Sequence, residues 1–490
     1  MTTPRYPKKA CAAGSQVRGD AAPWSAESAF NVNLHNGNVN NNHRNNSGFG
    51  LACRRAREFQ DAEGVQLRPL YDAYMAARRG KKPSYDKLAF DAHFIDGLLD
   101  LQAELNAGIW SPGPTTTFVA TRPKAREIHA PPFRDRVVHH LVVPPLEAIY
   151  ERRFYAHSYA NRKGKGSHAA VSYAQACVRQ VHSGQGGGFY LQLDIANFFI
   201  SIRRDKLWAM MKPVLLRAGL PAPIIAVTHA LLRGNPLRAG VRERATPAQF
   251  ALVPPHKRLC NARPRCGLPI GNLSSQFFSN IYLDALDQFV KHELGAKRYL
   301  RYVDDFVLFH HDRAQLVEWR RRIETFLADR LDLRLKDEIK LRPLTGGLDF
   351  LGYVIFPTHT LARRRVVAHL RQALADWEGA HVRGRELLGT PADFDHIRTV
   401  LASYHGHLKH AASHRLSRRL ERRFPWITAA AQPRRFSYRL QGRHITIRST
   451  HAPCTSTPSP STNCGSPRAT SARPAAHPSR ASRQASPRTA

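Results

Sequence analysis

Two adjacent acids interrupt an apolar stretch in the second half of the chain. The stretch RYVDDFVLFH predicts two short strands, 299–303 and 306–309, with Asp304 and Asp305 in a two-residue hairpin turn between them. Neighbouring carboxylates repel each other, and burying either without a partner costs free energy. Mg²⁺, a hard cation that prefers oxygen ligands, would compensate both charges. The alternative is a surface turn, where Asp is common because it hydrogen-bonds the local backbone.

A third acid favours the metal interpretation. Asp194 ends the apolar run in FYLQLDIANFFISI, and the aromatic residues Phe198 and Phe199 follow it. Two strands that each deliver an acid to one site provide the geometry that two-metal nucleotidyl transfer requires. Between the acids, GLPIGNLSSQFFSNIYLDALDQFV predicts a glycine-containing turn followed by an amphipathic helix. This order and spacing indicate the palm of a polymerase.

Together the three blocks resemble the reverse transcriptases, in which the first Asp lies in a strand and YxDD forms a hairpin. The resemblance implies an α+β right-hand polymerase with fingers, a palm of antiparallel sheet plus helices, and a helical thumb. It implies RNA-directed DNA polymerase activity, with Asp194, Asp304 and Asp305 as catalytic acids that bind two Mg²⁺ ions, which Mn²⁺ can replace. Template RNA, a DNA or RNA primer and deoxynucleoside triphosphates are then the expected ligands.

The middle block resembles that of one subfamily. Most reverse transcriptases have Gln-Gly-x-x-x-Ser-Pro here, whereas residues 270–276 read IGNLSSQ. This substitution, with FRDRVVHHL and SYANRKGKGSH, resembles the enzymes of diversity-generating retroelements. An aliphatic residue in place of one that can hydrogen-bond the incoming nucleotide should weaken discrimination between correct and wrong partners. We therefore expect error-prone copying of a template-repeat RNA, especially opposite adenine, and a small basic accessory variability protein as partner.

The resemblance also assigns residues that contact the incoming nucleotide. Arg126 corresponds to the family's triphosphate-contacting arginine, with Lys124 a weaker candidate, and Phe199 would place its ring against the sugar and exclude a ribose 2′-hydroxyl. The nucleotide-binding residues of the middle block would be Ile270, Gly271 and Gln276. A lysine shortly before DFLGY is expected to protonate the pyrophosphate leaving group, and both Lys336 and Lys340 fit that position.

Composition and patterning divide the chain into five parts. We expect an Asn-rich tract, N-terminal helices with the fingers, the palm with its acids, a helical thumb, and a basic Ser/Pro/Arg-rich tail disordered from about 449, over residues 1–55, 56–170, 171–356, 357–430 and 431–490. Residues 232–266 resemble an insertion with little structure of its own. Helical spacing predicts packed stripes at Leu70, Tyr74 and Met75 and at Phe94, Leu98, Leu101 and Leu105, and a helix over 316–331.

The Asn-rich tract is unlike a polymerase. Residues 31–46 contain nine asparagines and no acid, which composition alone assigns to a disordered tail. The run SAFNVNLHNGNVNNNHRNNSGFGLACRR also resembles the C-terminal end of the variable, C-type-lectin-like proteins of diversity-generating retroelements. Asparagine codons begin with two adenines, and adenines are the positions mutated in these elements. The reading frame is therefore interpreted as running through its own template repeat.

Net charge and apolar runs restrict the partners and the compartment. Lys and Arg number 74 against 37 acids, for a net charge of +37, which points to nucleic acid. No apolar run approaches the ~18 residues of a membrane span, and the first residues lack a secretion signal, so a cytoplasmic protein that does not bind membranes is expected. The seven cysteines contain no C-x-x-C pair, which favours free thiols over a zinc site at Cys260, Cys266 and His256.

Two rival functions remain open at this point. The first is a reverse transcriptase of another bacterial lineage, such as a group II intron or a retron. An intron enzyme usually adds a maturase region or an endonuclease module, and neither is recognisable in this tail. The second is an inactive nucleic-acid-binding relic, against which the presence of Asp194, Asp304 and Asp305 argues.

Overall fold

The computed structural model describes residues 64–80, 84–121, 124–184, 187–234, 236–237, 240–384, 386–431, 438–441 and 444–448 of the 490-residue chain. The Asn-rich tract and the tail from 449, on which the sequence made predictions, lie outside these residues. The described residues form helices and mainly antiparallel sheets, which confirms the α+β class. None of the described helices is both long and apolar enough to span a bilayer.

The described residues divide into two compact units. The first unit comprises those up to 373 together with 402–417, and the second comprises 374–401 and those from 418 onward. The division falls within three helices, α14 (Arg364–His381), α15 (Pro391–Leu408) and α16 (His414–Arg423). Each unit is considered by itself below.

Three short helices come first in the described part of the first unit: α3 (Leu67–Arg78), α4 (Tyr85–Ala92) and α5 (Phe94–Asn106). The predicted stripes are mostly confirmed, since the side chains of Leu70, Tyr74, Leu98, Leu101 and Leu105 are buried. Met75 was wrongly assigned to the stripe and is 41% exposed. One step along an α-helix turns the side chain by about 100°, so the residue after a buried Tyr74 leaves the packed face.

The remaining elements of the first unit follow in chain order. They are β1 (Thr115–Ala120), β2 (Arg126–Ala130), α6 (Phe133–Tyr150), α7 (Ser167–Gly184), β3 (Phe189–Asp194), α8 (Phe198–Ser201), α9 (Arg204–Arg217), α10 (Ala222–Arg233), β4 (Val241–Glu243), α11 (Pro247–Ala251), η1 (Pro255–Lys257), η2 (Leu259–Asn261), α12 (Leu273–Gln288), the π-helix η3 (Phe289–Glu293), β5 (Tyr299–Tyr302), β6 (Asp305–His310), α13 (Arg313–Leu331), β7 (Lys340–Pro343), η4 (Leu344–Gly346), β8 (Leu348–Phe350), β9 (Tyr353–Ile355) and β10 (Thr360–Ala362). The helix predicted over 316–331 is confirmed within α13. β10-β9-β8 form a small antiparallel sheet.

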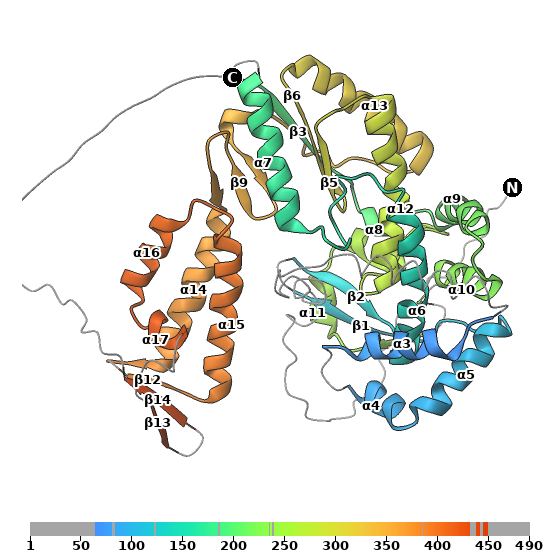
Figure 1. The fold of residues 1–490 in the computed structure, drawn as a ribbon, viewed down its shortest axis with the longest axis horizontal. Coiled ribbons are helices and arrows are strands. Elements are labelled where there is room, and N and C mark those ends of the chain that lie inside the picture. The colour runs from blue at the N-terminus through green and yellow to red at the C-terminus, as the bar shows by residue number, and fades with distance from the viewer. Residues whose placement is uncertain are drawn as a thin grey trace, which may run out of the picture. The chain divides into compact units, whose positions relative to one another are not determined.

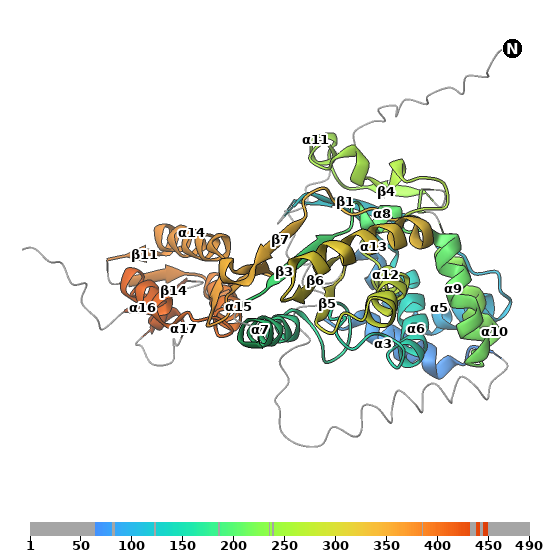
Figure 2. The same cartoon turned by 90° about the horizontal axis from the view of Figure 1, so that it is seen from above.

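A four-stranded antiparallel sheet in the order β5-β6-β3-β7 forms the centre of the first unit (Figures 1 and 2). Successive side chains of a strand point to opposite faces, and here both faces are apolar. Leu193 and Phe306 join one core with helices α12 and α13, whereas Tyr190 and Val307 join another core with α7. Helices therefore cover both faces, and the acids at the ends of β3 and β6 are held by the two central strands.

Residues 232–266 contain more order than the sequence predicted. β4 pairs in parallel with β1, so that the strands β2-β1-β4 form a second sheet. The short helix α11 begins with a reciprocal capping box between Thr246 and Gln249. The expectation of little structure was wrong because β4 is stabilised by a strand more than a hundred residues away, which local composition does not reveal.

The second unit combines helices with a sheet. Besides its parts of α14 and α15, it contains α16 (His414–Arg423) in part, α17 (Ile427–Ala431), β11 (Val382–Arg383), β12 (Glu386–Gly389), β13 (Tyr438–Gln441) and β14 (His444–Arg448). Its core includes Trp377, Phe394 and Trp426, with the two indole rings 4.5 Å apart. The expectation of helices alone was wrong here, because β12 pairs with β14 from beyond the predicted helical region.

Candidate active site

The acid-bearing hairpin is one residue out of the predicted register. Strand β5 ends at Tyr302, and the turn consists of Val303 and Asp304. Asp305 already belongs to β6, where it lies opposite Tyr302. The prediction that both acids occupy the turn was therefore wrong: Asp305 is held in the ladder by pairing with strands on both sides. Val303 has φ +58°, a left-handed conformation that costs energy for a β-branched residue.

The structure brings the three predicted acids together. Asp194, the last residue of β3, lies directly opposite Asp305 in the register of β3 and β6. Residues directly opposite on an antiparallel pair have Cβ atoms about 4.5–5.5 Å apart. The backbone N–H of Ile195 donates to the carbonyl of Asp304 at 3.3 Å, which ties the turn to the end of β3. Strand pairing thus gathers three carboxylates at one end of the sheet.

Burial and mutual repulsion make two of these carboxyls hard to ionise. Burial, and then the charge of Asp194, raise the pKa of Asp304 to about 6, against the opposing effect of Lys336 and Arg126. Burial likewise raises the pKa of Asp305 to about 7, even though Gln192 donates to both of its carboxylate oxygens at 3.1 and 3.2 Å. The surroundings of Asp304 and Asp305 therefore disfavour the charged form of both carboxyls.

Both candidate lysines lie near the acids. The backbone N–H of Lys336 donates to the carbonyl of Asp194 at 2.8 Å, and its ammonium forms an ion pair with the Asp194 carboxylate. Lys340, at the start of β7, partly offsets the raised pKa of Asp305 and lies 3.9 Å from a Glu338 oxygen. The geometry links Lys336 to the first acid and Lys340 to the last.

The donor set fits a divalent cation. Asp194 Oδ1 is buried and has no hydrogen-bond partner among the described residues, and carboxylate oxygens are the ligands that Mg²⁺ prefers. A bound cation would also relieve the repulsion that raises the pKa values of Asp304 and Asp305. In the described part of the chain no group of three or more His, Cys, Asp or Glu is already arranged as a metal site, Cys260 and Cys266 included, and the described cysteines are free thiols.

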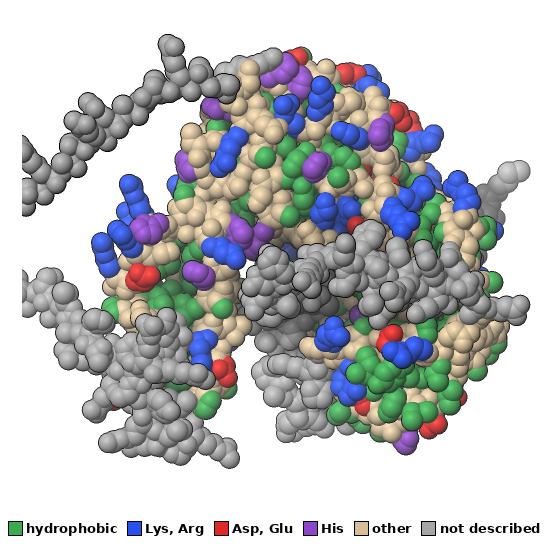
Figure 3. Space-filling model, viewed as in Figure 1, with side chains coloured by type: hydrophobic (Ala, Val, Ile, Leu, Met, Phe, Trp, Pro, Cys, Tyr) green, Lys and Arg blue, Asp and Glu red, His purple; other side chains and the backbone are tan. Residues whose placement is uncertain are grey.

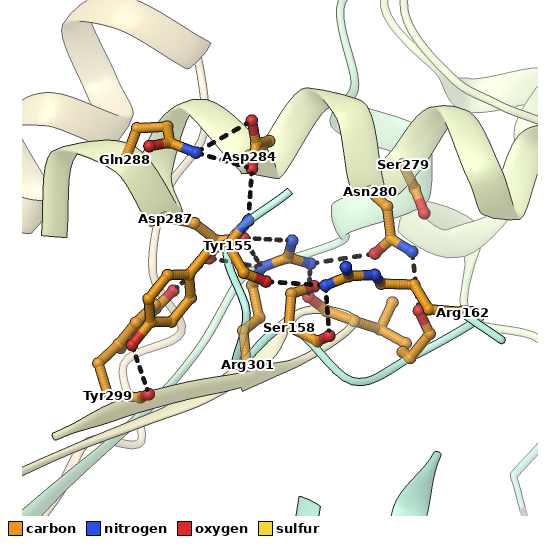
Figure 4. A network of polar contacts seen from close by, with 12 residues as sticks. Tyr155, Ser158, Arg162, Ser279, Asn280, Asp284, Asp287, Gln288, Tyr299 and Arg301 are labelled. Carbon is orange, nitrogen blue, oxygen red and sulfur yellow. Dashed lines mark hydrogen bonds and ion pairs between the residues drawn. The ribbon is translucent and has the colours of Figure 1, made fainter. Parts of the chain in front are cut away.

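A fully buried ion pair links strand β5 of the hairpin to helix α12 (Figure 4). Nε and Nη2 of Arg301, in β5, donate to the carboxylate of Asp287, in α12, at 2.6–3.1 Å, and both side chains are 0% exposed. Nη1 donates to the Val303 carbonyl at 3.0 Å and to Asn280 Oδ1 at 3.2 Å, and the Tyr299 hydroxyl donates to Asp287 Oδ1 at 2.7 Å. Arg301 thereby fixes the residue that precedes Asp304.

Burial opposes the charge of Arg301, but the Asp287 carboxylate outweighs burial and raises the pKa of the guanidinium above its ordinary value. The guanidinium of Arg301 therefore keeps its charge in the folded protein. Sequence reasoning missed Arg301 and Gln192. A signal was available, since each is a polar residue at a position of a buried strand where its neighbours are apolar.

The middle block lies against the strand of the predicted triphosphate-binding arginine. The carbonyl of Ile270 accepts a hydrogen bond from the His129 N–H of β2 at 2.8 Å. Gly271 has φ +119°, and a Cβ there would lie 2.9 Å from Ile128 Cγ2 and 3.0 Å from the His129 carbonyl oxygen, so the close approach requires glycine. Arg126, the first residue of β2, is exposed and lowers the pKa of Asp304. Ile270, Gly271 and Arg126 therefore belong to one assembly beside the acids.

The other predicted nucleotide contacts are less closely tied to the acids. Phe199 is half-buried in α8, five residues after Asp194, and its carbonyl accepts from Leu268 N–H at 2.8 Å. Lys124 is exposed two residues before β2, and Gln276 is half-buried in the first turn of α12. These positions leave the roles of Lys124 and Gln276 as predictions.

Basic side chains are more widespread than acidic ones on the visible described surface. On the face in Figure 3, Lys and Arg are spread over most of the visible elements and acidic side chains are few. The whole sequence has the same imbalance, with 74 basic and 37 acidic residues. The acids of β3 and β6 are thus a local exception in a molecule suited to polyanions.

Comparisons with known proteins agree with this site. Residues 119–355, which include all three acids, match the family described as reverse transcriptase (RNA-dependent DNA polymerase). The chain therefore contains a reverse transcriptase domain over that range. It is also similar to protein YkfC of Escherichia coli (strain K12), with 24% identity over 315 residues that cover 57% of this chain and 75% of YkfC.

Among solved structures, the chain is similar to two telomerases. Apo telomerase from Candida tropicalis, truncated from its C-terminal domain, matches with a TM-score of 0.38 and 11% identity over 51% of this chain and 56% of that chain. Telomerase from Candida albicans in complex with a fragment of telomeric RNA matches with a TM-score of 0.35 and 12% identity over 55% of this chain and 50% of that one. The chain spans about half the length of each.

Proposed function

We propose that this chain is an RNA-directed DNA polymerase whose catalytic acids are Asp194, Asp304 and Asp305. The observation that carries the proposal is the direct opposition of Asp194 and Asp305 beside the Asp304 turn, within a reverse transcriptase domain. Its substrates are template RNA, a DNA or RNA primer and deoxynucleoside triphosphates. Its two-metal mechanism uses Mg²⁺, which Mn²⁺ can replace.

The chain's own residues account for binding and positioning. Asp194 and Asp304 would hold the metal ions, and Asp305, which lies opposite Asp194, would complete the acid cluster. When bound, Mg²⁺ lowers the pKa of the primer 3′-hydroxyl and neutralises triphosphate charge. Arg126 binds the triphosphate, and the Phe199 ring excludes a ribose 2′-hydroxyl.

A lysine supplies the proton to the departing pyrophosphate. The ion pair between Lys336 and Asp194 supports Lys336 for this role, while the position of Lys340 beside Asp305 supports the alternative. Both lysines lie on the side of the sheet edge where the β3 and β7 segments meet, so either can reach the acid cluster. Substituting each lysine in turn and measuring the rate of primer extension distinguishes Lys336 from Lys340.

The finer proposal is a mutagenic enzyme of a diversity-generating retroelement. Ile270 lies against the Arg126 strand, where most reverse transcriptases have a glutamine that can hydrogen-bond the nucleotide. An aliphatic side chain offers no such hydrogen bond, so selection loosens, particularly opposite template adenine. The partner would be a small basic accessory variability protein that assists the synthesis of mutagenised cDNA.

Sequencing of cDNA tests this function. Purified protein, with and without the accessory protein, extends a primer on an adenine-containing RNA template, and errors are counted by template base for wild type, Ile270→Gln and Ile270→Leu. We expect errors concentrated at adenine in wild type and Ile270→Leu, and about tenfold fewer in Ile270→Gln, the scale of one hydrogen-bond discrimination. Faithful wild-type extension would refute the retroelement assignment, and unchanged errors in Ile270→Gln would refute the role of Ile270.

A further inference from the structure

A groove lies outside the acid cluster. Helices α9 and α10 pack side by side (Figures 1 and 2). Together with the segment 259–267 they line an open space of about 830 Å³. The groove is built partly from the 232–266 region that the sequence predicted to have little structure. All of its walls belong to the first unit.

The groove is lined by positive charge. Arg233, Arg263 and Arg265 line it and are exposed, and the backbone of Arg265 is left-handed, with φ +62°. The one lining carboxylate in the described part of the groove, Asp205, is already engaged by Arg203 through contacts of 2.6 and 2.9 Å. The guanidinium groups therefore keep a net attraction for a polyanion.

The groove also contains a flat aromatic platform. The rings of Trp208, in α9, and His229, in α10, stack with centroids 4.4 Å apart and planes 20° apart, and both side chains are half-buried. Burial, and then the nearby Arg233, lower the pKa of His229, so its ring is neutral at pH 7. Aromatic faces beside a cationic track are the combination that binds single-stranded nucleic acid, since every base can stack.

The wall of the groove runs directly into the nucleotide site. Arg204 N–H donates to the Arg265 carbonyl and Gly267 N–H to the Ile202 carbonyl, both at 2.9 Å. The next residue, Leu268, donates to the Phe199 carbonyl at 2.8 Å, and Ile270 follows two residues later. The segment that carries Arg263 and Arg265 is thus the one that positions the middle block.

We propose that this groove binds the unpaired part of the nucleic-acid strand next to the copied duplex, with arginines on phosphates and the Trp208–His229 pair stacked on a base. The inference rests on the proposed polymerase function. The groove would hold the single-stranded template outside the duplex, in addition to the contacts at the active site. This second contact would slow dissociation of the enzyme from its template.

Binding measurements on a catalytically inactive background test the groove. Fluorescence anisotropy of full-length Asp304→Asn protein would compare a primer–template duplex with a template overhang of two nucleotides and one of twelve, in RNA and in DNA versions. The groove variant is Arg263→Glu/Arg265→Glu. The matched control is Arg217→Glu/Arg313→Glu, which changes charge equally at exposed residues outside the groove.

We expect the long overhang to bind at least tenfold more tightly than the short one, and the groove variant alone to lose that advantage. The slope of log affinity against log salt should fall by roughly 1.4 for the long overhang, about 0.7 for each lost phosphate contact to a single strand. His229→Ala should weaken long-overhang binding roughly fivefold or more through lost stacking. Equal weakening of both substrates, or equal effects of groove and control variants, would overturn the proposal. Because binding is read without synthesis, a protein that binds the long overhang through the groove but never extends primers would refute the polymerase function and leave the groove standing.

Discussion

Replacing Arg301 by methionine should weaken both the fold and the active site, by separable routes. The variant leaves the Asp287 carboxylate buried at 0% exposure without its cation. Breaking a buried ion pair in this way costs about 3–5 kcal/mol, because the remaining charge is uncompensated. Urea unfolding followed by circular dichroism should report that loss in the free energy of unfolding.

The double variant Arg301→Met/Asp287→Leu separates stability from catalysis. Removing both charges should restore most of the stability, since a buried pair replaced by apolar residues of similar volume is often nearly neutral. Polymerase activity should stay low, because the Val303 carbonyl has lost the donor at 3.0 Å that fixes the turn before Asp304. The expected signature is a lower kcat with nearly unchanged KM for the nucleotide, as positioning of the acids is lost.

Two results would refute this reasoning. One is a stable double variant with full activity, which would mean that Arg301 serves folding alone. The other is a single variant with unchanged stability, which would mean that the pair is not buried as described. Arg321→Met, at an exposed pair with Glu318 on α13, is the matched control and should change neither quantity.

Two further predictions follow from the same site. In metal-free protein the free energy of unfolding should fall as pH rises from about 4 to about 7. Folding raises the pKa of Asp304 to about 6 and that of Asp305 to about 7. The folded state therefore retains protons that the unfolded chain releases near pH 4. Thermal unfolding should show this dependence on pH, and Mg²⁺ should raise the midpoint of thermal unfolding at pH 7. The double variant Asp304→Asn/Asp305→Asn should lose both the pH dependence and the stabilisation by Mg²⁺. A wild-type stability that does not change with pH would contradict the raised pKa values. Phe199→Ala should lower the preference for deoxy- over ribonucleotides roughly tenfold or more, by removing a steric barrier. Competing incorporation of the two nucleotides measures this, and an unchanged preference would assign the ring to packing.

Local pattern was enough to find the acids but not their register. Alternating apolar residues and the adjacent Asp304 and Asp305 predicted strands and a hairpin, and an apolar run ending in Asp194 predicted the partner strand. The turn was misplaced because the pairing of Asp305 with both neighbouring strands is a tertiary property. Gly271 was identified from the motif, but its close approach to β2 appears only in the fold.

The features that the sequence left hidden depend on distant partners. Arg301 reads as one more basic residue in a basic chain, and only folding brings Asp287 and Asn280 onto it. The groove of α9 and α10 likewise needs the 259–267 segment. The Leu259 N–H of that segment donates to the Glu127 carboxylate in β2, and its Arg265 carbonyl accepts from the Arg204 N–H at the start of α9. Composition identifies these residues as basic, whereas their roles depend on the residues that the fold packs against them.

The most direct test of the central claim is single-turnover extension of a primer by one deoxynucleotide on an RNA template with Mg²⁺. Wild type is compared with Asp194→Asn, Asp304→Asn and the control Asp329→Asn, an exposed acid on α13. We predict that each active-site variant loses at least about a thousandfold in rate, because positioning and charge stabilisation supply most of this chemistry, while Asp329→Asn remains as fast as wild type. Extension that survives in Asp304→Asn, or that fails in the wild-type protein while RNA binding is intact, would contradict the account.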